Sequence, residues 1–152
     1  MRIVLVRGFR ESYSQKNTRN KQNKQNKQIT NSTNKQINII MKIAFTTKGT
    51  DWDSNMDARF GRAEYFMVFD EDKKTLTTVS NKDVENEAHG AGPKAAQKIA
   101  EIKADILITG NGPGGNAATV LQKLGTTCYI GAGDMTMKEA YDAFRKGDLK
   151  RI

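Results

Sequence analysis

From residue 41 onward, short apolar runs alternate with polar or glycine-rich segments. Runs rich in β-branched and aromatic residues indicate strands, and they occur at residues 42–46, 64–69, 75–79, 104–109 and 126–130. A short charged turn over residues 70–74 joins the second and third runs, so these two strands form a hairpin. The sheet is therefore expected to begin with three consecutive strands.

Three further segments carry apolar residues at the spacing of a helix. Two of them follow glycine-rich turns, and the apolar face of the second includes Leu124 and stops at Gly125, a suitable C-cap. The last segment begins with Thr136 and Glu139 at the spacing of a capping box and closes at Gly147. The order of elements is βββαβαβα, which predicts an α/β fold with a mixed five-stranded sheet and three helices on its faces.

Charge divides the chain at residue 40. Nine of the 25 Lys and Arg residues lie before residue 41, together with one of the 17 Asp and Glu residues, so this segment carries the whole net charge of +8. Residues 21–28 repeat Lys, Gln and Asn, with nothing apolar to bury. We expect residues 1–40 to be a disordered basic tail or a non-native upstream extension, and residues 41–152 to be the folded domain. Because that domain is neutral, we expect it to bind no nucleic acid.

The number of cysteines and the length of the apolar runs indicate where in the cell the protein is located. Cys128 is the single cysteine, which excludes an intrachain disulfide and any multi-cysteine metal motif. A reducing environment suits such a chain, and Cys128 is most simply a small core residue. No apolar run approaches the ~20 residues that span a bilayer. We therefore expect a cytoplasmic protein that does not enter a membrane.

Residues 47–59 form a polar segment that is long for a loop in a compact domain. Long loops are often functional, so this one is a candidate flap or binding edge. It contains Asp51, Asp53 and Asp57, but their spacing lacks the pattern and the closing glutamate of a calcium loop. We interpret the segment as a solvated loop.

The turn before the first helix is the strongest candidate for chemistry. There the only histidine, His89, lies beside Gly90 and Gly92 and just before Pro93. Glycine lets the backbone approach a ligand closely, and the free amides at a helix start attract anions. These residues favour an anionic ligand, metallic or not, beside His89. The alternative is a helix start whose partly buried histidine only fixes the turn.

A second glycine-rich turn follows a later strand and precedes the next helix. Gly110, Gly112 and Gly115 fit the dinucleotide fingerprint G-x-G-x-x-G, with Asn111 and Gly114 between them. The acidic residue expected after the next strand is missing, and so is a Walker lysine, which argues against dinucleotides and nucleoside triphosphates. In open α/β sheets ligands bind beyond the carboxyl ends of the strands, so both glycine turns are expected to face one crevice.

Several short motifs occur together in the domain: Arg-Phe-Gly-Arg at residues 59–62, residues 66–70, Asn81, His-Gly-Ala-Gly at 89–92, Ala-Asp at 104–105 leading to Gly110, Lys-Glu-Ala at 138–140 and Gly-Asp-Leu at 147–149. Together they resemble the dinitrogenase iron-molybdenum cofactor biosynthesis family, which comprises small cofactor carriers of nitrogenase maturation and their relatives. The resemblance covers Met41 to Ile152 and none of the first forty residues.

The resemblance implies a ribonuclease-H-like sheet with three helices, and a role in binding or carrying an iron–sulfur or iron-molybdenum type metallocluster. A metallocluster assembly or acceptor protein would be the partner. Carried over by position, His89 is the expected metal-contacting residue. The surrounding cofactor-binding wall would comprise Gly90, Gly92, Gly110, Asn111, Gly112 and Gly114, with Arg59 and Arg62 assisting an anionic cargo.

The carboxylates that a two-metal nuclease needs do not occur on the expected strands, so we expect no enzyme. Two other functions remain as alternatives to a cluster carrier. A small-molecule or nucleotide-binding regulatory domain that uses the turn at Gly110 is the main alternative. An interaction module with a vestigial site is the third possibility.

Overall fold

The structure is a computed structural model, and it describes residues 40–152. The tail expected over residues 1–40 therefore lies, except for its last residue, outside the described part. The elements in chain order are β2 Lys42–Thr47, β3 Tyr65–Asp70, β4 Thr75–Ser80, α1 Lys82–Glu85, α2 Ala91–Ile102, β5 Ile106–Ile108, α3 Gly115–Lys123, β6 Thr127–Ile130, α4 Met137–Lys146 and β7 Lys150–Arg151.

The strands form one mixed sheet in the order β4-β3-β2-β5-β6-β7. β3 pairs antiparallel with both β2 and β4, as the predicted hairpin requires. β5 lies parallel to β2 and to β6, whereas the short β7 pairs antiparallel with β6. The carboxyl ends of the three parallel strands therefore meet at the same edge of the sheet.

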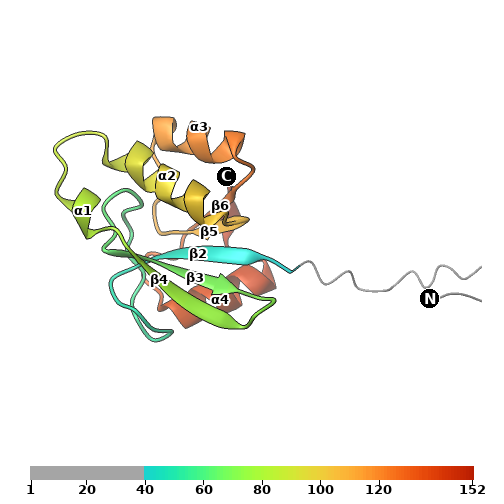
Figure 1. Cartoon of the computed structure of the whole chain (residues 1–152). Helices are drawn as coiled ribbons and strands as arrows, with labels where there is room; N and C mark the ends of the chain where they lie inside the picture. The colour runs from blue at the N-terminus through green and yellow to red at the C-terminus, as the bar shows by residue number, and fades with distance from the viewer. Residues whose placement is uncertain (1–39) are drawn as a thin grey trace, which may run out of the picture. The chain divides into compact units, whose positions relative to one another are not determined.

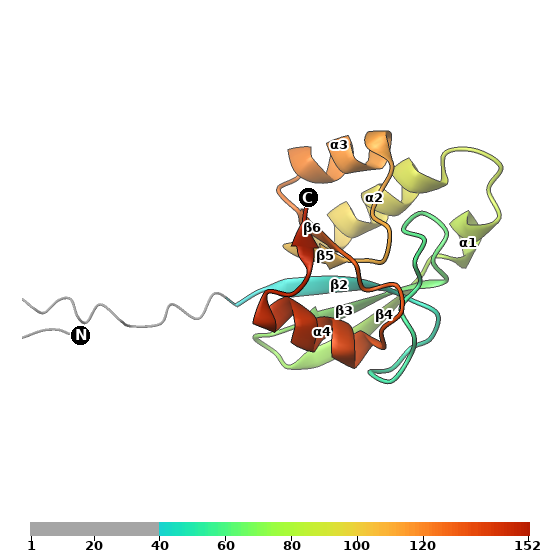
Figure 2. The same ribbon diagram turned by 180° about the vertical axis from the view of Figure 1, so that it is seen from behind.

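Helices cover both faces of this sheet. α2 and α3 lie side by side on one face and α4 lies on the other (Figure 1), an arrangement that the reverse view also shows (Figure 2). Because β2 is central and covered on both sides, every residue from Ile43 to Thr47 is buried. Alternate residues of the strand serve different layers: Ala44 packs under α2 and α3, and Phe45 packs under α4.

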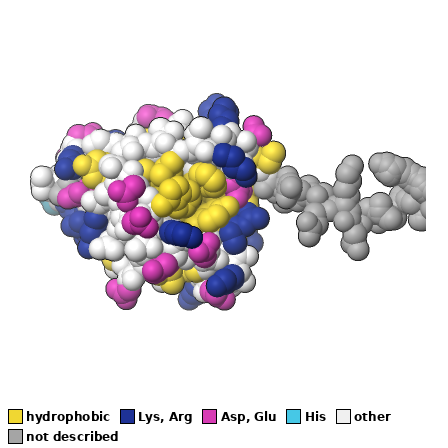
Figure 3. Space-filling model, turned by 90° about the horizontal axis from the view of Figure 1, so that it is seen from below, with side chains coloured by type: hydrophobic (Ala, Val, Ile, Leu, Met, Phe, Trp, Pro, Cys, Tyr) yellow, Lys and Arg dark blue, Asp and Glu magenta, His cyan; other side chains and the backbone are white. Residues whose placement is uncertain are grey.

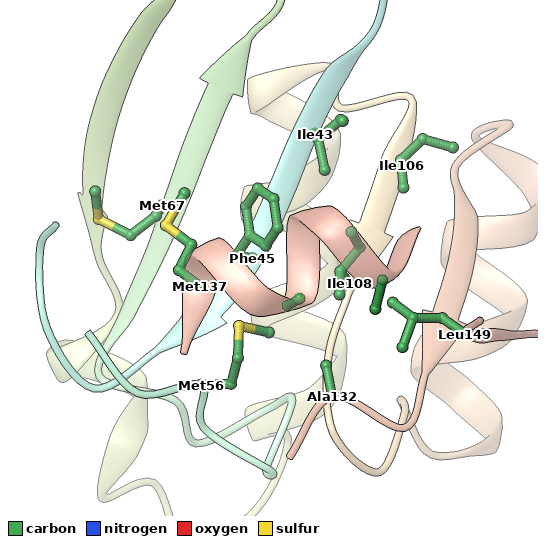
Figure 4. Close-up of a cluster of buried hydrophobic side chains, with 11 residues drawn as sticks. Ile43, Phe45, Met56, Met67, Ile106, Ile108, Ala132, Met137 and Leu149 are labelled. Atoms are coloured by element: carbon green, nitrogen blue, oxygen red, sulfur yellow. The ribbon is translucent and has the colours of Figure 1, made fainter. Parts of the chain in front are cut away.

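The core under α4 holds as many buried side chains as the core under α2 and α3, and more partly buried hydrophobic side chains pack against it. Phe45 from β2, Ile108 from β5 and Met137 from α4 lie together there (Figure 4), each fully buried. Burial of one such side chain contributes about 1.5–3 kcal/mol. α4 itself is defined by its caps: the Thr136 hydroxyl accepts the Glu139 N–H at 3.2 Å, and Gly147 ends the helix with φ +84°. Both caps were predicted.

Aromatic side chains extend this core toward β3 and β4. Trp52 makes edge-to-face contacts with Phe45, Phe69 and Tyr141, with ring centroids 5.0–6.3 Å apart. Hydrophobic side chains gather on this face of the molecule, with charged side chains around them (Figure 3). Trp52 belongs to the predicted loop over residues 47–59, so that segment is part of the packed fold.

The mixed α/β class is confirmed, but the predicted counts are wrong. The described residues contain six strands and four helices in the order βββααβαβαβ, not the ribonuclease-H-like set of five strands and three helices. α1 has four residues and β7 has two. Segments this short contain too few residues to show a helical or strand-like hydrophobic pattern in the sequence. Leu124 is also not a core residue: α3 ends at Lys123, and Leu124 is 52% exposed beyond the last helical turn.

Candidate functional site

The segment over residues 47–59 forms a fixed wall at the carboxyl edge of the sheet. Thr47 and Met56 form an isolated antiparallel bridge, and Asn55 forms another with Thr136. The Met56 N–H donates to the Met135 carbonyl at 2.9 Å, which ties the segment to the turn before α4. These bonds and the contacts of the partly buried Trp52 tie the segment to the rest of the domain, and its role as a flap stays a prediction.

Asp57 lies at the end of this wall and is buried, with a side chain only 1% exposed. Its carboxylate accepts hydrogen bonds from the Arg59 backbone N–H, Nε and Nη2 at 2.9, 3.0 and 2.7 Å. Burial by itself would raise the pKa of Asp57, but the Arg59 hydrogen bonds and the charges of Arg59 and Lys48 outweigh it and hold that pKa below the ordinary value of 3.8. The Arg59 guanidinium is thus oriented, and its charge is balanced by a buried carboxylate.

The Arg59 to Arg62 turn contacts the start of α2. A Cβ placed on Gly61 would lie 3.0 Å from the Gly92 backbone N and 3.1 Å from its Cα, so the two backbones touch. A Cβ on Gly92 would in turn lie 3.5 Å from the Ala117 Cβ of α3. The structure therefore brings the arginine turn, the histidine turn and the first turn of α3 together, as the prediction of one crevice requires.

The second glycine turn meets the same wall from the other side. The Asn111 N–H donates to the Ala58 carbonyl at 2.9 Å. A Cβ on Gly110 would lie 2.5 Å from the Ala58 Cα and 2.9 Å from the Gly133 Cα. Glycine is required at position 110 because three backbone segments converge there.

Gly112 and Gly114 differ in whether the structure requires a glycine at that position. Gly112 has φ +90°, and a Cβ there would approach the Ile130 Cγ2 to 2.9 Å, so its backbone conformation and packing both account for glycine. Gly114 has φ −70° and ψ 173°, an extended conformation open to any residue, and a Cβ on Gly114 or Gly115 would meet nothing within 4 Å. Neither strain nor packing explains glycine at positions 114 and 115, which leaves the amides of α3 accessible.

The two helix starts at this edge lack the caps that α4 has. The N-caps of α2 and α3 are Gly90 and Gly114; neither helix has a side-chain cap hydrogen bond or an acidic residue in its first turn. Free N–H groups at a helix start carry the positive end of the helix dipole. Since a Cβ placed on Gly92 of α2 would reach van der Waals distance of the Ala117 Cβ of α3, these two positive ends are adjacent.

His89 precedes α2 on the connection from α1. Its side chain is exposed, which rules out the alternative of a partly buried residue that fixes the turn. Within residues 40–152 it forms no hydrogen bond or ion pair that would orient the ring. A histidine of a permanent metal site usually donates its second ring N–H to a partner. Within the described residues, nothing therefore fixes the orientation of the His89 ring.

The described residues contain no group of three or more His, Cys, Asp or Glu that could hold a metal ion. Cys128 is buried in the core under α2 and α3, and burial raises its pKa to about 11. Its thiol therefore stays protonated near neutral pH and does not supply a thiolate ligand.

Sequence reasoning missed two positions in the site. Gly61 lies inside the Arg59 to Arg62 motif, yet its contact with Gly92 joins residues far apart in the chain and leaves no local signal. Asn81 is fully buried, and its amide donates to the carbonyls of Gly61 and Ala63. Asn81 is one of the motifs that carry the family resemblance, and this was the available sign in the sequence.

Comparison with known proteins agrees with this architecture. A family model described as dinitrogenase iron-molybdenum cofactor matches residues 41–147. The orange protein from Desulfovibrio gigas, solved in its apo form, is 33% identical with a TM-score of 0.70, over 74% of this chain and 93% of that one. A Thermotoga protein of the DUF35 family, provisionally assigned as NifB, is 35% identical with a TM-score of 0.64, over the same shares. No curated protein sequence matches the chain.

The fold and its edge define a class: a small mixed α/β domain with two adjacent, uncapped helix starts at the carboxyl edge of the sheet. The chain belongs to the dinitrogenase iron-molybdenum cofactor family, as its motifs predicted. This membership indicates a metallocluster-associated role in cofactor assembly. None of the helices in residues 40–152 has the length and hydropathy to span a membrane. The cytoplasmic location stays a prediction.

Proposed function

We propose that this protein reversibly binds a metallocluster of the iron–sulfur or iron-molybdenum type and carries it to an assembly or acceptor protein, without acting as an enzyme. The observation that carries the proposal is the pair of adjacent, uncapped N-termini of α2 and α3, with accessible backbone at Gly114 and Gly115. Membership in a family described by the iron-molybdenum cofactor supports a cluster as the cargo.

The chemistry of this edge suits a large anion. Each helix start contributes roughly half a positive charge and free N–H donors, although Pro93 supplies none in the first turn of α2. Clusters of this type are anionic, and their sulfur atoms accept hydrogen bonds from backbone amides. Gly90 at the start of α2 and Gly114 at the start of α3 are both exposed, and a Cβ on either would meet nothing within 4 Å. Amides from both helices can therefore face one cargo.

Two features favour exchange over permanent binding. Asp57 balances the charge of Arg59, which lowers the net positive charge that the cargo meets. His89 is a single exposed imidazole, and a borderline ligand of this kind can contact iron and then release it. A carrier must give up its cargo, so several strong protein ligands would oppose that function.

The test is an anaerobic titration of the full-length chain with isolated iron-molybdenum cofactor, followed by visible absorbance. We expect saturable binding, and about a tenfold rise in Kd for His89→Ala, which corresponds to ~1.4 kcal/mol. Gln122→Ala is the matched control: it removes an exposed side chain at the far end of α3 and should change Kd less than about twofold.

Three results are informative. Equal affinities of wild type and His89→Ala would remove His89 from the site. Absence of saturable binding by folded wild-type protein would reject the carrier function. A thermal-shift experiment with ATP and NAD provides the third: stabilisation by a nucleotide, without stabilisation by the cofactor, would favour the regulatory domain.

A further inference from the structure

Asn81 connects the end of β4 to the candidate site. Its side chain is fully buried, and its Nδ2 group donates to the Ala63 carbonyl at 2.9 Å and to the Gly61 carbonyl at 3.3 Å. Its backbone N–H donates to the Glu64 carbonyl at 2.8 Å. One residue thus donates hydrogen bonds to three carbonyls within residues 61–64.

The Asn81 side chain carries a cost. In the part of the chain that the structure describes, its buried Oδ1 has no hydrogen-bond donor. An unpaired buried acceptor lowers stability. A serine or threonine at this position would have no amide oxygen to leave unpaired, and its hydroxyl could still donate to one carbonyl. Among the uncharged side chains, only a primary amide offers two N–H groups from one atom. In return, Asn81 donates hydrogen bonds to the Gly61 and Ala63 carbonyls at the same time.

The turn held by Asn81 has little freedom to move without affecting α2. Phe60 anchors one side of the turn in the core, 5.9 Å from the Phe66 ring centroid. On the other side Gly61 already touches the backbone of Gly92 and Ala91, with hypothetical Cβ distances of 3.0–3.3 Å. A displacement of Gly61 therefore changes how the first turn of α2 presents its free amides.

We propose that Asn81 is a positioning residue for the site: it fixes the Gly61 to Ala63 turn and, through Gly61, the N-terminus of α2. This inference rests on the proposed function, because it assigns Asn81 to the same site. Asn81 acts from within the protein and does not touch the cargo.

The experiment compares Asn81→Leu, which keeps the size of the side chain but removes both N–H groups, with Thr126→Val. Thr126 is the matched control because it is also buried, and its hydroxyl donates to the Ala104 carbonyl at 2.9 Å near the amino ends of β5 and β6. Both substitutions remove buried hydrogen bonds and should lower the melting temperature. Isolated iron-molybdenum cofactor is the probe, and the full-length chain is titrated well below both melting temperatures.

We expect Kd to rise about tenfold or more for Asn81→Leu and less than about twofold for Thr126→Val. Asn81→Ser keeps one donor and should give an intermediate Kd, and it serves in place of Asn81→Leu if the leucine variant does not fold. A wild-type Kd in a destabilised Asn81 variant would overturn the inference, since Asn81 would then be structural only.

A second measurement does not depend on the cargo. In the ¹H–¹⁵N spectrum of the ligand-free protein, the Gly92 amide peak should shift in the Asn81 variants and stay in place in Thr126→Val. An unmoved Gly92 peak would overturn the positioning role. If wild-type protein binds no cofactor while the Gly92 peak moves as expected, the proposed function fails and the positioning of α2 by Asn81 stands.

Discussion

Asp57→Asn should lower the stability of the domain and make that stability less dependent on pH in the acidic range. The asparagine keeps the shape of the side chain and one carbonyl oxygen for the Arg59 N–H. It loses the negative charge and turns an N–H group toward Arg59 Nη2, so the 2.7 Å hydrogen bond is lost and the 3.0 Å bond from Nε is weakened because its acceptor becomes neutral.

The magnitude follows from burial. Hydrogen bonds to charged groups contribute about 1.5–3 kcal/mol each. Arg59 is 54% exposed, so water recovers part of its interactions after the change, and the cost stays below the 3–5 kcal/mol typical of a broken buried pair. We expect a loss of about 2 kcal/mol in the free energy of unfolding at pH 7, or roughly 6–10 °C in melting temperature.

The sign of the pH dependence follows from the lowered pKa of Asp57. Between that folded-state pKa and the ordinary value of 3.8, the unfolded chain binds the extra proton, so stability rises with pH through this window. The contribution of Asp57 is complete above about pH 5 and is lost as the pH falls through the folded-state pKa. The stability difference between wild type and Asp57→Asn should therefore shrink at pH 3.

Urea denaturation of both proteins at pH 7, 4 and 3 measures this difference. The control is Asp53→Asn, since Asp53 lies exposed in the same segment and its change should stay within about 0.5 kcal/mol. A loss below about 0.5 kcal/mol for Asp57→Asn at pH 7, or an equal loss at pH 7 and pH 3, would refute the reasoning.

Three further predictions concern the glycine turn at Gly110, the N-cap of α4 and the buried thiol of Cys128. Gly110→Ala should cost about 2–3 kcal/mol because its Cβ would meet backbone on two sides, whereas Gly114→Ala should leave the melting temperature nearly unchanged; equal effects in thermal denaturation would contradict the packing account. Thr136→Ala should cost about 1 kcal/mol by removing the cap of α4, and an unchanged urea midpoint would show that the cap adds nothing. At pH 8 iodoacetamide should label native Cys128 at least about 100-fold more slowly than the urea-unfolded chain; similar rates would mean that the thiol is accessible.

The sequence by itself determined the elements whose evidence is local. Strand and helix periods depend on which face of a segment is buried, and that information repeats every two to four residues. The hairpin of β3 and β4, and the ends of α4 at Thr136 and Gly147, were therefore readable in advance. The motifs also sufficed to predict the family, because each of them lies within a few consecutive residues.

Only the tertiary structure decided what each glycine and polar residue does at the carboxyl edge. Gly110 and Gly114 look alike in the sequence, yet one is crowded by Ala58 and the other borders open space. Asn81 and Gly61 lie 20 residues apart and are joined by a hydrogen bond. Contacts of this kind depend on how separate segments approach in space, and since no short pattern encodes that approach, the shape of the site follows from the packing of the whole sheet.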